Sequence, residues 1–236
     1  MSPKNLLIFT DIGDDIDDSL ALTYLLENTN HKICAVITSH GNIDYRLKVA
    51  QELFTFFDNP PPLIWGTKEL FSKQIHEDNE RLCIAIKQHL SPREKITILC
   101  LCAATDLAHL IFNTPEITDV IEEIRYQWII EYSSIWPLAD LDSYNFKTDP
   151  AAIHFCLTQN IPHQKITKHD AYKHPFREQD FLQFTKKADL NEYLLSKALT
   201  WQSRFKELNH AKRQEVYGPD PTVLSYPYDL LVAQNV

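Results

Sequence analysis

Glycine is scarce in this sequence, which has four glycines among 236 residues. Loops that cradle phosphate groups need glycine so that the backbone can approach the ligand closely. Neither G-x-G-x-x-G nor G-x-x-x-x-G-K-[ST] occurs in the sequence. The lack of glycine therefore argues against nucleotide-phosphate chemistry.

Long apolar runs and an excess of basic charge are also lacking. No stretch reaches the roughly 18–20 uncharged apolar residues of a membrane helix, and the first apolar run is too short for a signal peptide. We therefore expect a cytoplasmic protein that does not contact membranes. The net charge of −9 argues against nucleic-acid binding, which needs a basic face.

The cysteines do not form a recognisable metal or disulfide pattern. Their number is odd, and no C-x-x-C or cysteine/histidine spacing typical of zinc sites is present. We expect buried free thiols in a reducing compartment. The five cysteines are Cys34, Cys83, Cys100, Cys102 and Cys156.

Short apolar runs alternate with amphipathic segments along the first two thirds of the chain. The predicted strands are 5–10, 32–38, 95–101, 124–132 and 161–167. The predicted helices between and after them are 17–27, 45–57, 78–90, 103–112, 149–157, 178–187 and 190–209, and 66–76 is a predicted loop. This alternation favours an α/β fold with a mostly parallel central sheet and helices on both faces, a Rossmann-like three-layer arrangement. We expect one domain over residues 1–236.

Five aspartates lie between positions 11 and 18, in the stretch FTDIGDDIDDSLAL that follows the first predicted strand. In open α/β sheets, ligands bind beyond the carboxyl ends of the strands. Helix capping and the helix dipole explain one or two acids there, such as Asp17 and Asp18. Several carboxylates about 4–6 Å apart repel one another unless a cation lies between them, and Ca²⁺ prefers such oxygen ligands.

Two other interpretations of this acidic stretch stay open. The first is a solvated acidic loop whose aspartates only cap a helix. The second is phosphoryl transfer through a D-x-D pair, which is disfavoured because Ile12 and Gly13 follow Asp11. An EF-hand is excluded, because its D-x-[DN]-x-[DN]-G spacing is absent.

The segment TDIGDDIDDSLAL resembles the N-terminal signature of the nucleoside hydrolases, the calcium-dependent N-ribohydrolases that prefer inosine and uridine. Four further segments are similar to motifs of that family in the same order, and together the five span most of the chain. They are VITSHGNID (36–44), ILCLCAATDLAHLI (98–111), YNFKTDPAA (144–152) and YPYDLLVA (226–233).

The resemblance implies a Ca²⁺ site that combines distant parts of the chain. Asp11 would ligate the ion and act as the general base on the attacking water. Asp18 and Asp229 would be further ligands, and Thr105 would contribute its backbone carbonyl. Such an ion would also offset the repulsion among the aspartates.

The resemblance further implies a small nucleoside-like substrate, whose N-glycosidic bond is hydrolysed. Asp17, Asn42 and Asn145 would hold the ribose hydroxyls, and Asp15 would lie behind the metal ligands. Without the resemblance, Asn42 and Asn145 would be interpreted as turn residues. Family members are usually dimers or tetramers, so a homo-oligomer is expected.

Some positions depart from the family pattern. Tyr228, a candidate catalytic residue, stands where many members have the histidine that protonates the leaving base. A tyrosine, with a reference pKa of about 10, is a weaker acid, but it can hydrogen-bond the base. Ser143 replaces a glutamate, and Pro137 lies near the place of a ribose-binding asparagine. The chain also ends seven residues after Asp229, earlier than in most members. The alternative is a catalytically impaired relative that binds a ribosyl ligand or a protein partner without turnover.

Overall fold

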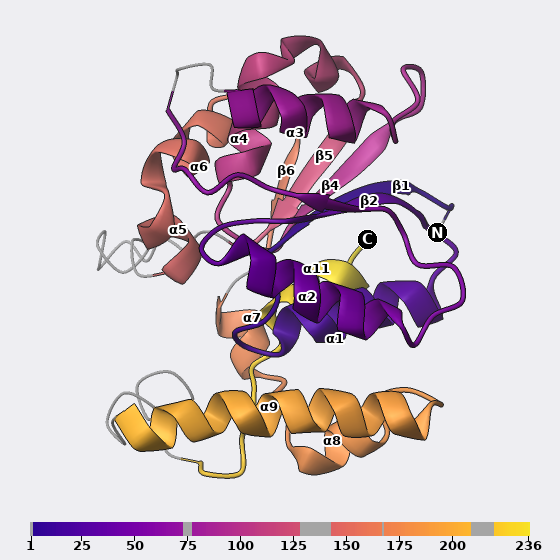
Figure 1. The fold of residues 1–236 in the computed structure, drawn as a ribbon, viewed down its shortest axis with the longest axis vertical. Coiled ribbons are helices and arrows are strands. Elements are labelled where there is room, and N and C mark those ends of the chain that lie inside the picture. The colour runs from indigo at the N-terminus through magenta and orange to yellow at the C-terminus, as the bar shows by residue number, and fades with distance from the viewer. Residues whose placement is uncertain (1, 73–76, 128–142, 167, 209–219) are drawn as a thin grey trace.

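The computed structural model describes residues 2–72, 77–127, 143–166, 168–208 and 220–236. At its centre lies a six-stranded sheet in the order β3-β2-β1-β4-β5-β6, in which every pair of neighbours is parallel (Figure 1). The strands are β1 (Asn5–Thr10), β2 (Lys32–Thr38), β3 (Leu63–Trp65), β4 (Ile96–Cys100), β5 (Ile121–Tyr126) and β6 (His163–Lys165).

The strand order reverses between β1 and β4. From β1 the chain proceeds outward through β2 to β3, and it then returns to the other side of β1 to build β4, β5 and β6. In doubly wound folds, ligands bind at the carboxyl ends of the strands where the order reverses. This topology places Asp11, which directly follows β1, at the expected binding position.

Among the described residues, helices cover both faces of the sheet (Figure 1). On one face lie α3 (Glu77–Lys87), α4 (Thr105–Asn113) and α6 (Pro150–Leu157), and on the other lie α1 (Asp17–Asn28), α2 (Ile43–Phe54) and α11 (Tyr228–Gln234). Successive side chains of a strand point to opposite faces. Leu7 and Phe9 of β1 therefore join the first core, and Leu6 and Ile8 join the second, all fully buried.

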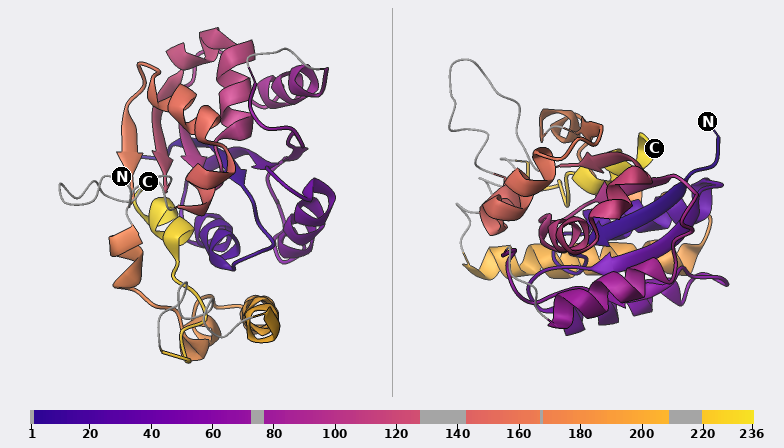
Figure 2. Two further views of the ribbon diagram at one scale, coloured as in Figure 1. Left: turned by 90° about the vertical axis from the view of Figure 1, so that its left-hand side faces the viewer. Right: turned by 90° about the horizontal axis from the view of Figure 1, so that it is seen from above.

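A further helical layer packs outside α1 and α2. It consists of α8 (Glu178–Leu182) and the long helix α9 (Ala188–Leu208), which is seen end-on beyond α1 in the left view of Figure 2. Lys197 of α9 bonds Glu52 of α2 at 2.7 Å, and Lys187 donates to the backbone oxygen of Phe56 at 2.7 Å. Within the described residues, no helix is both long and apolar enough to cross a membrane.

The predicted fold class is confirmed, whereas several element boundaries were wrong. β5 begins at Ile121 rather than at 124, and residues 128–132 of that predicted strand lie outside the described residues. β3 was missed because three residues are too few to show a strand period. The sequence prediction also missed the short helices α5 (Tyr144–Thr148) and α7 (Lys168–Tyr172) and the 3-10 helix η1 (Pro115–Asp119).

Asp106 in the first turn of α4 joins two loops, those after β2 and β3, at the carboxyl edge of the sheet. Its fully buried carboxylate accepts hydrogen bonds from the Ser39 hydroxyl, from the Thr67 backbone N–H at 2.8 Å and from the Thr67 hydroxyl at 2.7 Å. A Cβ atom on Gly66 would overlap the Asp106 carboxylate and lie 2.5 Å from the Thr38 backbone oxygen. Only glycine fits at position 66.

We expect Gly66→Ala to lower the free energy of unfolding by about 2–3 kcal/mol, because overpacking displaces the Asp106 carboxylate from its donors. Urea denaturation measures the change. Gly41→Ala is the matched control: it has a left-handed backbone (φ 71°), and its Cβ atom would make only an ordinary van der Waals contact with the Arg46 side chain, 3.5 Å away, so it should cost only about 1–2 kcal/mol. A cost for Gly66→Ala no larger than that of the control would contradict the steric argument.

Candidate active site

Three buried carboxylates from distant parts of the sequence meet where α1 and α11 pack together. Asp17 and Asp18 lie in the first turn of α1, and Asp229 lies in the first turn of α11. One oxygen of each lies within 4.8 Å of the others, and the exposed fractions of the three residues are 4–8%. The sequence assigned Asp17 to ribose binding, and the structure places its carboxylate in the same group as Asp18 and Asp229.

A hydroxyl group and a helix dipole stabilise the charged forms of these carboxylates. The hydroxyl of Thr10, the last residue of β1, donates to Oδ1 of Asp18. The amino-terminal end of α1 carries the partial positive charge of the helix dipole, which favours acids in the first turn. Neither contact supplies a full positive charge to the group.

The group is electrostatically strained. Burial raises the pKa of Asp18 well above its usual value, and Asp11 raises it further. Burial also raises the pKa of Asp17, with additional repulsion from Asp15, Asp18 and Asp11. The pKa of Asp229 is raised well above its usual value by burial and then by Asp17, Asp18 and Asp11.

Asp11 belongs to the same electrostatic system. Burial and the nearby Asp14 raise the pKa of Asp11 to about 6, although the positive charge of Arg46 lowers it. Asp11 in turn raises the pKa values of Asp17, Asp18 and Asp229. Hard carboxylate oxygens that repel one another in a buried place match the ligand preference of Ca²⁺, so the residues present fit a hard cation.

Arg46, which the sequence analysis missed, connects two loops beside these acids. Its buried guanidinium donates to the Ile12 backbone oxygen at 3.2 Å, to Oδ2 of Asp14 at 3.0 Å and to the His40 backbone oxygen at 2.6 Å. The arginine thus fastens the loop after β1 to the loop after β2. A helix arginine usually points into solvent, and only the excess of acid nearby could have suggested a buried basic partner.

Gly13 explains why the loop after β1 can turn beneath α2. Its φ of +119° is rarely adopted by residues with a side chain, and a Cβ atom there would lie 2.9 Å from the Tyr45 ring. The Tyr45 hydroxyl donates to the Gly13 backbone oxygen at 3.1 Å. The glycine therefore allows α2 to approach the acidic loop closely.

The other predicted residues lie around the same edge of the sheet. Exposed Asn42 caps α2 by accepting a hydrogen bond from the Tyr45 N–H at 3.1 Å. Asn145 of α5 is buried and donates to the backbone oxygens of Leu101 and Gln127 at 3.4 and 3.5 Å. Thr105 donates its hydroxyl to Oδ2 of Asp149 at 2.7 Å.

Tyr228 lies in an aromatic group next to the acids. Its ring centroid is 6.3 Å from that of Tyr172 and 6.5 Å from that of Tyr226. Burial raises the pKa of Tyr228 above its usual value, and Tyr172, Asp15 and Asp17 add to this effect. The phenol therefore keeps its proton at neutral pH.

Ser143 and Asp15, which the sequence analysis singled out, both make hydrogen bonds near the acidic site. The Ser143 hydroxyl caps α5 by accepting a hydrogen bond from the Phe146 N–H at 3.1 Å. Asp15 accepts a hydrogen bond from the Ser225 hydroxyl at 2.8 Å, which ties the acidic loop to the segment before α11. Pro137 lies outside the described residues.

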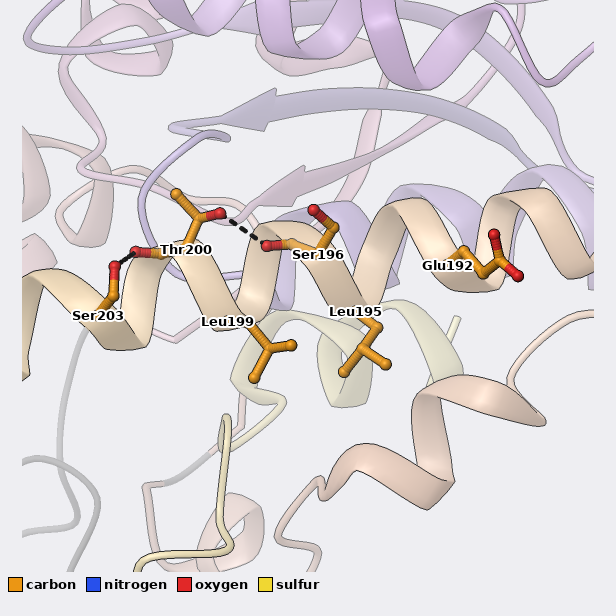
Figure 3. Close-up of a pocket in the computed structure, with 6 residues that line it drawn as sticks. All are labelled: Glu192, Leu195, Ser196, Leu199, Thr200 and Ser203. Carbon is orange, nitrogen blue, oxygen red and sulfur yellow. Dashed lines mark hydrogen bonds between the residues drawn. The ribbon is translucent and has the colours of Figure 1, made fainter.

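A shallow hollow on α9 is separate from this site. Figure 3 shows its lining, in which Thr200 donates to the Ser196 backbone oxygen at 2.8 Å and Ser203 to the Thr200 backbone oxygen at 2.7 Å. Glu192 supplies the single carboxylate of this lining. The hollow therefore lacks the converging acids found at the start of α1.

Comparison with known proteins agrees with the sequence motifs. Residues 6–233 match the model of the family described as inosine-uridine preferring nucleoside hydrolase. The chain belongs to the nucleoside hydrolase family. A search of curated proteins finds no match.

Solved structures show that the chain has the fold of this family. A plant nucleoside hydrolase, the PpNRh1 enzyme, is 18% identical, with a TM-score of 0.71 over 98% of this chain and 79% of that chain. The type III effector protein XopQ complexed with adenosine diphosphate ribose is 18% identical, with a TM-score of 0.70 over 98% of this chain and 80% of that chain. An inosine-uridine preferring nucleoside hydrolase from Bacillus anthracis is 16% identical, with a TM-score of 0.67 over 98% and 80%.

Without metal, we expect Asp18→Asn to stabilise the protein at pH 8 and to stabilise it less at pH 5. The folded-state pKa of Asp18 lies above the unfolded value of about 3.9, so the folded state binds more protons and its stability falls as pH rises. The gain at pH 8 should reach about 1–3 kcal/mol. Thermal unfolding in EGTA measures it, with exposed Asp44→Asn as the control. A gain that does not grow with pH would contradict the electrostatic account.

We expect Arg46→Met to cost about 2–4 kcal/mol, because it removes three hydrogen bonds and leaves buried acceptors without donors. Arg81→Met on α3 is the matched control, since Arg81 makes an exposed ion pair with Glu77 and should cost less than about 1 kcal/mol. Urea denaturation at pH 7 compares the two variants. Equal costs would show that Arg46 is not a structural connection between the loops.

Proposed function

We propose that the protein catalyses metal-dependent hydrolysis of the N-glycosidic bond of a ribonucleoside or a related ribosyl compound. The observation that carries the proposal is the convergence of Asp17, Asp18 and Asp229 at the carboxyl end of β1, where the charge of Asp11 raises their pKa values. Membership of the family supports the substrate class.

Asp18 and Asp229 would hold Ca²⁺, together with Asp11 and the backbone carbonyl of Thr105. Both acids are almost fully buried and close together, so each can present an oxygen to one ion. When bound, such an ion lowers the pKa of a ligated water and orients vicinal ribose hydroxyls.

Asp11 would accept the proton of the attacking water. Without the ion, the pKa of Asp11 is about 6, and a bound cation would lower it. Proton transfer is most effective when the pKa of the base lies near the working pH. Asp17, the Asn42 amide and the side-chain oxygen of Asn145 would hold the ribose. Breaking the bond makes the sugar oxocarbenium-like, and nearby carboxylates stabilise that positive charge.

Tyr228 would contact the base without protonating it. Its phenol keeps its proton because burial raises its pKa. It can therefore donate a hydrogen bond to the base, but it does not readily transfer its proton to the base. Tyr172 and Tyr226 extend the aromatic surface on which a planar base can pack.

The second candidate function is binding of a ribosyl ligand or a protein partner without turnover. The raised pKa of Tyr228 favours this candidate, because the acid that many members use is lacking at this position. A structural neighbour of the chain, XopQ, was solved with adenosine diphosphate ribose, which suits a ribosyl ligand.

We expect the wild-type protein with Ca²⁺ to release ribose from at least one of inosine, uridine, cytidine, adenosine and nicotinamide riboside. Asp229→Asn should lower kcat by a factor of about 10² or more, because a charged ligand at the reacting centre is lost. Exposed Asp44→Asn serves as the control and should retain wild-type kcat. A reducing-sugar assay measures the product.

The same experiment distinguishes the two candidate functions. Calorimetry with Ca²⁺ and each nucleoside accompanies the assay. Binding of both without sugar release would support the non-catalytic relative, and sugar release that EGTA leaves unchanged would contradict a metal-dependent reaction.

A further inference from the structure

His40 has a backbone conformation that residues with side chains rarely adopt. Among the described residues it is the one non-glycine residue with positive φ, at 64°. This left-handed conformation costs about 1–2 kcal/mol relative to glycine. Strained residues of this kind gather at functional sites, where the surrounding structure holds them in place.

The surroundings of His40 do hold it. Arg46 donates to the backbone oxygen of His40 at 2.6 Å. The preceding residue, Ser39, donates its N–H to the Thr10 backbone oxygen at 2.8 Å and its hydroxyl to Asp106. Connections on both sides of His40 thus fix a conformation that glycine would adopt without strain.

The imidazole of His40 lies at the rim of the acidic site. It packs edge-on against the ring of Tyr144, with centroids 6.4 Å apart, and Tyr144 is 62% exposed. Asp11 and Asp14 are close enough to Tyr144 to help raise its pKa. The Ser39 to Thr10 hydrogen bond places the loop that carries His40 beside the loop that carries the proposed general base, Asp11, and solvent can still reach this rim.

Charged groups from three elements face this imidazole. Burial lowers the pKa of His40, and Arg46 of α2 lowers it further, whereas Asp149 at the start of α6 and Asp14 in the loop after β1 raise it. In the described part of the chain, the titratable Tyr144 of α5 also packs against this imidazole. An imidazole has a reference pKa of about 6.5, so it exchanges protons near neutral pH far more readily than a phenol.

We propose that His40 is a further catalytic residue of the hydrolysis, which contacts the departing base and transfers a proton to it. This inference rests on the proposed function. The water oxygen bonds to the ribose C1′ while the bond from C1′ to the base nitrogen breaks, and its electron pair stays on the base. The base takes the proton of the His40 imidazolium, the water gives a proton to the Asp11 carboxylate, and solvent restores both side chains.

Two substrates with different leaving groups test this assignment. Inosine or uridine needs a proton on the departing nitrogen, whereas 4-nitrophenyl ribofuranoside releases a stable phenolate without one. We expect His40→Asn, which tolerates the left-handed backbone, to lower kcat on the nucleoside by a factor of about 10²–10⁴. Its kcat on the nitrophenyl riboside should stay close to that of the wild type.

A second variant separates catalysis from folding. His40→Gly relieves the backbone strain, so its melting temperature should equal or exceed that of the wild type, and it should lose nucleoside turnover as His40→Asn does. Exposed His154→Asn on α6 is the matched control and should keep wild-type rates on both substrates.

The outcomes decide between the two proposals. The role of His40 would be overturned if His40→Asn lost the same factor in kcat on both substrates, or if its nucleoside turnover were unchanged. In either case, cleavage of the nitrophenyl riboside by the wild-type protein would still uphold the proposed function. Failure of the wild-type protein to cleave any of these substrates in Ca²⁺ would overturn both.

Discussion

The mutual repulsion of buried carboxylates is the constraint on which the rest of this site depends. Packing of α11 against α1 brings Asp229 to Asp17 and Asp18, in a place where burial raises the pKa of each acid. Such an arrangement destabilises the charged forms unless positive charge comes near. A bound cation and the positive charge that develops on a departing sugar would both supply it, so the same strain that opposes folding favours the proposed reaction.

Buried polar connections keep the rim of the site in place around these acids. Arg46 joins the loops after β1 and β2, Asp106 joins the loops after β2 and β3 to α4, and Asp149 joins Thr105 to Phe71 and α6. Each group is buried and accepts or donates several hydrogen bonds, so removing one partner leaves others unsatisfied. The loops that carry the proposed catalytic groups are therefore held by side chains that do not take part in the chemistry.

The sequence predicted the parts of this structure that follow from local pattern. Alternating apolar and amphipathic segments identified the parallel α/β fold, and the density of aspartates after the first strand identified the acidic site. Asp229 could be linked to Asp18 only through resemblance to a family, because no local pattern connects residues so distant in sequence. Arg46 and the conformation of His40 could not be predicted, since both depend on tertiary contacts. β3 was missed because three residues give no period.

A crystal structure of the protein grown with Ca²⁺ would test the central claim most directly. Strong density for one ion, with oxygens of Asp18 and Asp229 both at about 2.3–2.6 Å, is the result that the account predicts. An ion held elsewhere, or carboxylates of α1 and α11 that remain in contact with each other and exclude the ion, would contradict it.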